Sequence, residues 1–384
     1  MHDKIKRELF FTMEEYQARL KTIRGAMEKR GIEVLLIASP ESIYYVSGYQ
    51  TFGFHNYAFL ALPLDGQPFL ILRYLESFLA YRYAWFDDVV SWDDTTDPVK
   101  VTVDALNERG HGGKTIGIEE KSYFLQVANY KKLQAALPKV VDGSGCVEVA
   151  RAIKSKQELA YMREAAKLTD LGFQAAVEEI HEGRTDNDVA AAAFDAMTRA
   201  GAEWLTRDPI VTTGERSGLP HSCYMRQTLK DGDAVLLEYS GVFNRYYSPL
   251  MRGAVVGKAS QAVERLASVC IEALNAALNA IRPGVSSGEV DLASRSIIER
   301  AGLWDNYRKR TGYSVGIGFS SWVEGAIASL KEDDPTVLAP GMCFHIPIAL
   351  RLYGEAGVGF SETVTVTETG VEVLGKHPRE LARR

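Results

Sequence analysis

The chain has 384 residues, more than one hydrophobic core usually holds, so two domains are expected. It is 46% apolar and 24% charged, as globular proteins are, and its net charge of −6 has no blocks that would suit nucleic acid. The charged first residues contain no signal-peptide pattern, and no run reaches the ~20 apolar residues of a membrane-spanning helix. We therefore expect a cytoplasmic protein that binds neither nucleic acid nor a membrane.

The first 150 residues alternate predicted helices and strands, and Gly31 follows the first helix. Short apolar runs without polar alternation indicate strands that are buried on both faces. These residues are therefore predicted to form an α/β domain over 1–150. Its predicted elements are a helix over Met13–Arg30, a strand over Val34–Ile37, a hairpin of Phe59–Leu62 and Phe69–Leu72, and a strand over Thr115–Ile118.

A second domain is predicted over 151–384. Ser155 and Glu158 have the spacing of a capping box, in which the two side chains satisfy free N–H groups at a helix start. Apolar residues then recur at helical spacing as far as Ile180. The domain boundary is therefore expected just before this helix.

The second domain contains an internal repeat. The pattern I-x-x-G-x-[ST]-x-x-[DE]-V begins at Ile180 and again 101 residues later, at Ile281. Each copy predicts a helix, a glycine turn and a capped helix, and a pair of strands follows each copy. The duplication predicts a pseudo-twofold domain with a site between its halves.

This organisation resembles the pita-bread hydrolases, which include creatinase, prolidase and aminopeptidase P. The resemblance rests on the segments Arg151–Glu158 and Met162–Ala166 at the entry to the second domain, and on Leu338–Met342 and Glu362–Gly370 near its end. It covers nearly the whole chain, the N-terminal part more weakly. It implies a creatinase-like α/β domain followed by a pita-bread catalytic domain.

The peptidases of this fold hold two metal ions through two Asp, one His and two Glu, and the ions activate a shared water. Matched segment by segment, the two Asp positions hold Glu238 and Pro249, the His position holds Tyr313, and the two Glu positions hold Pro347 and Ser361. Proline offers no ligand atom, and Tyr and Ser are rare ligands for such ions. No metal ligand and no cofactor are expected.

Two metal-free branches of the fold are creatinase and the ectoine hydrolases, and the chain resembles the second more closely. That resemblance rests on the segments Glu238–Arg252, Arg310–Tyr313 and Gly341–His345. It implies that Glu238 attacks the substrate ring or activates water. The structural alternative is a buried ion pair between Glu238 and Arg252, because an unpaired carboxylate is costly in an apolar strand.

Four further catalytic candidates follow from the resemblance. His221 is the expected proton carrier, with an ordinary loop histidine as the alternative. Tyr313 is expected to bind a carboxylate or orient Glu238, and His345 to face the cleft; core packing is the alternative for both. Glu362 is a possible second carboxylate beside Ser361, or else a solvent-facing strand residue.

The expected substrate-binding residues are Arg252, Tyr246 and Trp322, together with an aromatic loop of the first domain that holds Phe52, Phe54 and His55. In the resembled family this loop often reaches the site of a neighbouring subunit. The resemblance therefore implies a homodimer, with local packing of the loop as the alternative.

The resemblance implies metal-independent hydrolysis of a C–N bond in a small zwitterionic compound, with ectoine or another cyclic amidine as the leading substrate. Glu238 would pair with the amidinium and attack its carbon, and a histidine would carry protons to the departing nitrogen. The alternatives are a creatinase-like guanidino-acid hydrolase, a metal-dependent Xaa-Pro aminopeptidase and a non-catalytic binding protein.

Overall fold

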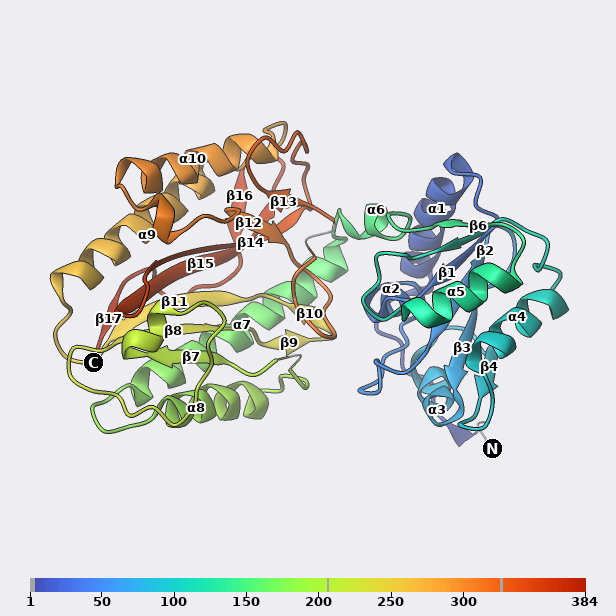
Figure 1. Ribbon diagram of the computed structural model, residues 1–384, viewed down its shortest axis with the longest axis horizontal. Helices are drawn as coiled ribbons and strands as arrows, with labels where there is room; N and C mark the ends of the chain where they lie inside the picture. Colours follow the sequence, from blue (N-terminus) through green and yellow to red (C-terminus); the bar gives the residue numbers. More distant parts are fainter. Residues whose placement is uncertain (1–3, 206, 325–326) are drawn as a thin grey trace. The chain divides into compact units, whose positions relative to one another are not determined.

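The protein is described by a computed structural model that covers residues 4–205, 207–324 and 327–384 (Figure 1). It divides into two compact units, Met1–Arg151 and Ala152–Arg384. Within the described ranges, no helix is long and apolar enough to cross a membrane.

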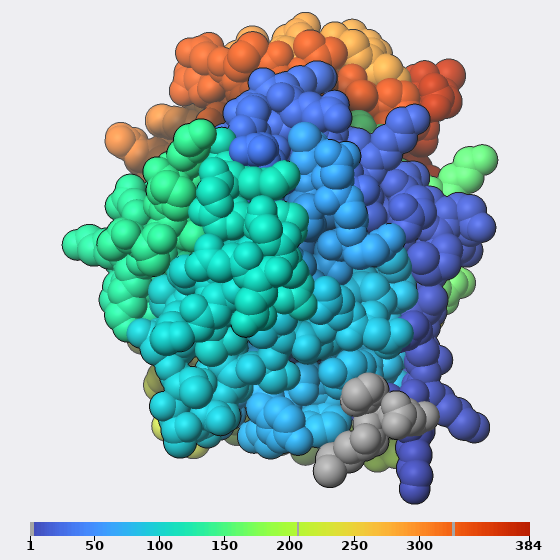
Figure 2. All heavy atoms as spheres, turned by 90° about the vertical axis from the view of Figure 1, so that its right-hand side faces the viewer, coloured from blue at the N-terminus to red at the C-terminus, as the bar shows by residue number. Residues whose placement is uncertain are grey.

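The first unit is built on one mixed sheet with the strand order β4-β3-β2-β1-β5-β6. The central β1 is buried along its whole length, because it pairs antiparallel with β2 and parallel with β5. Figure 2 looks onto this unit and shows residues of the α3 to α4 region, light blue to teal, on the surface. The strands are β1 (Val34–Ile37), β2 (Phe59–Pro63), β3 (Phe69–Arg73), β4 (Val89–Trp92), β5 (Ile116–Ile118) and β6 (Val140–Asp142). The helices are α1 (Met13–Lys29), α2 (Pro40–Ser47), α3 (Tyr74–Tyr83), α4 (Pro98–Glu108), α5 (Val127–Ala136) and α6 (Glu148–Arg151).

The second unit has the predicted duplication. The pair α7 (Lys156–Glu179) and α8 (Asp186–Arg199) matches the pair α9 (Gln261–Ala280) and α10 (Ser287–Arg300). The capping box of α7 is confirmed, and α8 and α10 begin with equivalent capping boxes. Gly183 and Gly284 hold the matching turns, each with φ of 85°, a conformation that favours glycine.

Strands follow each pair of helices and form two main sheets, with the orders β17-β11-β8-β7 and β13-β12-β14-β15-β16. The strands of the first copy are β7 (Ile210–Thr213), β8 (Ala234–Tyr239), β9 (Val242–Phe243), β10 (Tyr246–Tyr247) and β11 (Leu250–Val255), with the 3₁₀ helix η2 (Gly214–Gly218). Those of the second are β12 (Gly312–Ser314), β13 (Ser329–Leu330), β14 (Cys343–Leu352), β15 (Ala356–Val366), β16 (Val371–Val373) and β17 (Ala382–Arg383), with the 3₁₀ helix η3 (Trp304–Asn306).

Each of these sheets has a helix-covered face and an inner face. Val235 and Leu237 of β8 belong to one core with α7 and α8, whereas Ile346 and Ile348 of β14 belong to another with α9 and α10. Side chains alternate between the two faces of a strand. Leu236 and Ala349, which adjoin these residues along β8 and β14, therefore point the other way, and they form a separate small cluster with Ile210 and Met251. This inner face is shared by both halves of the duplication.

Candidate active site

Glu238 lies on the inner face near the end of β8. It is the half-buried residue of a strand that is otherwise buried, so solvent reaches the sheet at this carboxylate. Its strand partners are Met251 on β11 and Ile210 on β7. Burial raises the pKa of Glu238, and the positive charges of Lys309, Arg351 and Arg207 oppose that rise.

A chain of hydrogen bonds crosses the inner face of the second sheet. Trp322 Nε1 donates to the hydroxyl of Tyr313 at 3.1 Å, and that hydroxyl lies 2.9 Å from His345 Nδ1. His345 Nε2 in turn lies 2.7 Å from Ser361 Oγ, which also accepts from the backbone N–H of Met251 at 2.6 Å. These hydrogen bonds thus connect Tyr313 and Ser361, two positions that the resemblance matches to metal ligands of the pita-bread peptidases.

The two ionisable residues of this hydrogen-bond chain, Tyr313 and His345, are uncharged near neutral pH. Burial raises the pKa of Tyr313, and the nearby charge of Glu238 raises it further. Burial also lowers the pKa of His345 well below its usual value, and the charges of Lys309 and Arg252 add to that effect. A neutral imidazole has one donor and one acceptor nitrogen, so His345 can donate to only one of its two hydroxyl partners at a time.

Two arrangements of protons are therefore compatible with the hydrogen bonds of His345 to Tyr313 and Ser361. If His345 donates from Nε2 to Ser361, the Tyr313 hydroxyl donates to Nδ1. The hydroxyl proton of Ser361 is then free to be donated to another group. If His345 instead donates from Nδ1 to Tyr313, Ser361 donates to Nε2. The hydroxyl proton of Tyr313 is then free to be donated to another group. Switching between the two arrangements moves a donatable proton from one end of the chain to the other, which is what a proton relay requires.

Three cationic side chains near Glu238 were missed by the sequence analysis. Arg351 follows His345 and Ala349 at even spacing along β14, which places it on the inner face. Lys309 Nζ donates to the carbonyl of Pro347, and Arg207 lies 4.9 Å from the ring centre of Trp322. The alternation along β14 was a usable signal for Arg351, whereas nothing in the local sequence marks Lys309 or Arg207.

His221 lies in the exposed loop after η2, and its φ is 56°. Partial loss of solvent lowers its pKa, followed by the charges of Arg207, Arg351 and Lys309. The same cations act on Glu238, so His221 belongs to the electrostatic surroundings of this site.

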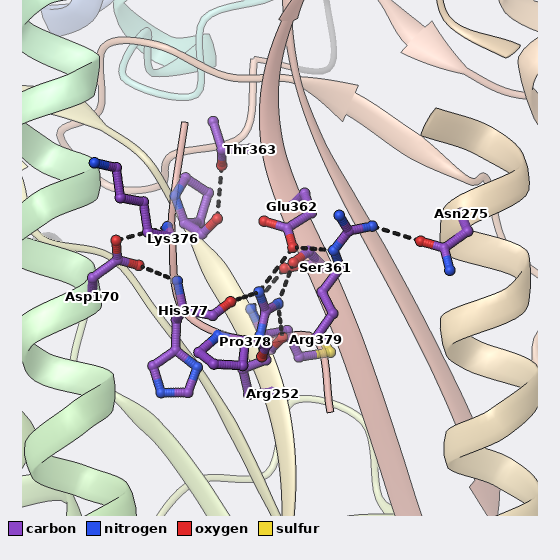
Figure 3. A network of polar contacts seen from close by, with 12 residues as sticks. Asp170, Arg252, Asn275, Ser361, Glu362, Thr363, Lys376, His377, Pro378 and Arg379 are labelled. Atoms are coloured by element: carbon purple, nitrogen blue, oxygen red, sulfur yellow. Dashed lines mark hydrogen bonds and ion pairs between the residues drawn. The ribbon is translucent and has the colours of Figure 1, made fainter. Parts of the chain in front are cut away.

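Arg252 and Glu362 differ from expectation, because both lie on the helix-covered face. Arg252 follows Met251, and Glu362 follows Ser361, so each points away from the inner face. Their side chains are 2% exposed and form an ion pair of 2.8 Å (Figure 3). The alternative in which Arg252 pairs with Glu238 is therefore wrong, and neither Arg252 nor Glu362 joins the candidate site.

The surrounding contacts explain why this pair is structural. Arg252 also donates to the carbonyls of Ser361, His377 and Pro378, and Arg379 forms a second ion pair with Glu362 at 3.1 Å (Figure 3). The guanidinium thus joins β11 and β15 to the C-terminal segment.

The other expected substrate-binding residues have separate surroundings. Tyr246 is fully buried, and its hydroxyl donates to the capping-box carboxylate of Glu158 at 2.8 Å, which indicates a structural role. In the first unit, Phe54 packs edge-to-face against Phe124, as the local-packing alternative anticipated. The substrate-binding role of this aromatic loop, which also holds the exposed Phe52 and His55, stays a prediction.

Comparison with known proteins places this geometry in a family. Residues 160–368, more than half of the chain, match the family described as Metallopeptidase family M24, and residues 19–153 match the Creatinase/Prolidase N-terminal domain. The chain belongs to the M24 family. The expected fold class, a creatinase-like α/β domain followed by a pita-bread domain, is confirmed.

Relatives within the family carry different names. The chain is 32% identical to a Sinorhizobium fredii protein described as uncharacterized hydrolase/peptidase y4tM, over 98% of this chain and 99% of that one. It is 28% identical to the ectoine hydrolase of Halomonas elongata, with coverage of 98% and 99%. It is 29% identical to the Xaa-Pro dipeptidase of Pyrococcus furiosus, with coverage of 94% and 99%. A Thermococcus sibiricus prolidase structure, 25% identical, superposes with a TM-score of 0.87 over 97% of this chain and all of that one.

The M24 family implies a metal centre, but the side chains of this site do not fit one. Pro347 and Ser361 face each other across β14 and β15, and the first offers no donor atom in its side chain. Tyr313 and Ser361 are already engaged with His345. Across the described ranges, no group of three or more His, Cys, Asp or Glu side chains is arranged to hold a metal ion. The site instead combines the carboxylate of Glu238 with the uncharged hydrogen-bond chain through His345. Three cations, Lys309, Arg351 and Arg207, act on that carboxylate.

Proposed function

We propose that this M24 hydrolase cleaves a C–N bond in a small zwitterionic cyclic amidine, as ectoine hydrolase does with ectoine, and does so without a metal. The observation that carries the proposal is the composition of the inner face. Glu238 is present where the fold's first metal ligand lies, while Pro249, Pro347 and Ser361 replace three others and Tyr313 joins a hydrogen-bond chain. The similarity to the Halomonas elongata enzyme extends over almost the whole length of both chains.

The side chains suggest how such a reaction proceeds. An amidinium is planar and positively charged, so the carboxylate of Glu238 attracts it and lies beside its electrophilic carbon. A bond from a Glu238 oxygen, or from a water that Glu238 deprotonates, forms at that carbon. The ring C–N bond then breaks as its nitrogen takes a proton from Tyr313 or His221. If water was the nucleophile, this step gives the N-acyl diamino acid directly. If Glu238 is the nucleophile, a water molecule finally cleaves its ester-like link to the product.

The cations have a defined part in this scheme. Burial alone would favour a protonated, unreactive Glu238. The charges of Lys309, Arg351 and Arg207 oppose this rise in the pKa and so favour the ionised form that a nucleophile or base needs.

The test is a turnover screen on purified protein. Ectoine, hydroxyectoine, creatine and an Xaa-Pro dipeptide are each incubated with the enzyme, once with a chelator and once with added Mn²⁺. We expect ring opening of ectoine or hydroxyectoine to persist in chelator, and elemental analysis to find no stoichiometric divalent metal. Proline release that depends on Mn²⁺, together with about two bound ions per chain, would establish the dipeptidase alternative instead.

The similarity to the Pyrococcus furiosus Xaa-Pro dipeptidase is what favours that alternative. Turnover of creatine alone would favour the guanidino-acid hydrolase, and binding without any turnover would favour a non-catalytic protein.

We further propose that the active form is a homodimer, in which the aromatic loop around Phe54 reaches the site of the partner subunit. Light scattering at working concentration checks this. A monomer with full activity is incompatible with the proposal.

A further inference from the structure

The inner face carries positive charge that no carboxylate of the described residues neutralises at close range. Arg351 and Lys309 form no ion pair with any described carboxylate, and Nε of Arg351 is buried without a hydrogen-bond partner among the described residues. Lys309 Nζ donates to the carbonyl of Pro347 and lies 5.0 Å from the ring centre of Tyr307, and neither group carries a negative charge. Cations in partly desolvated positions are costly unless an anion pairs with them.

Glu238 is not the anion that pairs with these cations. It acts on Lys309 and Arg351 from a distance, since neither cation lies within ion-pair range of its carboxylate. The cations also outnumber the carboxylate, because Arg207 is a third positive charge that acts on Glu238. The excess positive charge of the site therefore favours the binding of an anionic ligand.

The two cations reach the site from different elements. Arg351 is on β14, and Lys309 is in the loop before β12, held to β14 through Pro347. Two donors that approach from separate elements suit a planar carboxylate, since the guanidinium supplies directed N–H groups and the ammonium supplies a compact charge.

We propose that Lys309 and Arg351 form the subsite for the carboxylate of the substrate, next to Glu238. This rests on the proposed function and adds an orientation to it. The substrate's cationic, reacting end turns to Glu238, and its carboxylate turns to the two cations. A zwitterion is then bound in one direction, and a cation without a carboxylate is rejected by like charge.

The experiment compares Lys309→Met and Arg351→Gln with wild type. Arg308→Gln is the matched control, because Arg308 is exposed in the same loop and pairs with Asp305. Two ligand pairs are used, each with and without carboxylate charge: ectoine and its methyl ester in steady-state kinetics, and succinate and succinamide in calorimetry. Melting temperatures show that each variant is folded.

We expect wild type and Arg308→Gln to prefer the charged member of each pair. Lys309→Met and Arg351→Gln should each weaken carboxylate binding on the order of tenfold to a hundredfold and leave the uncharged members nearly unaffected. For ectoine the loss should fall on KM more than on kcat, because the carboxylate is remote from the reacting carbon.

The outcomes separate this subsite from the proposed reaction. Ectoine turnover with an unchanged KM in both variants overturns the subsite and leaves the reaction standing. Charge-dependent succinate binding that both variants lose, without ectoine turnover, supports the subsite and overturns the reaction. If wild type shows no preference for either charged ligand, the subsite is overturned.

Discussion

Ser361 and Glu362 are adjacent on β15 but serve opposite faces of the sheet. Ser361 Oγ lies 2.7 Å from His345 Nε2 on the inner face, while Glu362 pairs with Arg252 at 2.8 Å on the helix-covered face. The backbone joins the two environments, since the carbonyl of Ser361 accepts from Arg252. A shift of one residue along a strand therefore exchanges a site position for a structural one.

Glu238→Gln is expected to abolish turnover without loss of stability. The amide keeps the shape of the side chain but removes the charge, so neither attack on an amidinium nor activation of water remains. We expect turnover to fall on the order of a thousandfold or more, and the melting temperature to hold, because a desolvated carboxylate has been removed. Near-normal turnover in this variant would refute the assignment, and the exposed Glu215→Gln serves as the control.

If turnover is lost, mass spectrometry after rapid quench distinguishes the two roles of Glu238. A covalent adduct on its peptide identifies a nucleophile. Product formation without an adduct identifies a general base.

Tyr313→Phe is expected to impair both the relay and local stability. The change removes one hydroxyl and leaves Trp322 Nε1 and His345 Nδ1 without their shared partner. We expect turnover to fall about a hundredfold and the free energy of unfolding to fall by about 1–3 kcal/mol. Kinetics and urea denaturation on one preparation measure both effects.

Tyr307→Phe is the control for the relay, because Tyr307 is also buried but its hydroxyl donates to the backbone carbonyl of Arg310. It should keep near-normal turnover. Equal losses in the two variants would mean that Tyr313 is a packing residue.

Local sequence signals predicted much of the fold. The capping box at Ser155 and the duplicated pattern from Ile180 and Ile281 depend on neighbouring residues, and the structure has both. The sequence analysis assigned no helix to α2, where Ile43 to Val46 is an aromatic and β-branched run. Burial in the tertiary structure outweighs that local preference.

The site was less accessible to sequence reasoning. Glu238, Tyr313 and His345 were found through the resemblance, and the structure brings them to one face. Arg252 and Glu362 were misplaced, because a motif gives the position of a residue but not the side of the sheet that it faces. Lys309 comes from a loop, and its approach to Glu238 depends on long-range folding that no local pattern encodes.

Binding of a carboxylate substrate is expected to weaken as the pH rises through about 8. Burial, followed by the charge of Arg351, lowers the pKa of Lys309 to about 8, and Glu238 opposes the decrease. The ammonium is charged below this pKa and neutral above it, so the attraction for an anion is present at lower pH and is lost as pH rises. KM for ectoine, measured from about pH 6 to about pH 10, should increase above pH 8 in wild type. In Lys309→Met the same increase should be absent, and its persistence would assign it to another group.

Glu362→Gln is expected to destabilise the fold while leaving the chemistry intact. The substitution leaves the buried charge of Arg252 without its carboxylate, and removing one partner of a buried ion pair costs on the order of 3–5 kcal/mol. The control is Glu372→Gln, since Glu372 pairs with Arg163 where both side chains are more than a third exposed. An exposed pair contributes about 0–1 kcal/mol, so the control should unfold nearly as wild type does.

Urea denaturation of the two variants gives the difference in the free energy of unfolding, and turnover is measured below the unfolding transition. The folded Glu362→Gln protein should keep kcat within a few-fold of wild type, because the carboxylate lies on the face of β15 away from Glu238. Loss of turnover at unchanged stability would instead assign Glu362 to the reaction. It would also mean that the network of Arg252, Arg379 and the C-terminal segment acts on the inner face through Ser361.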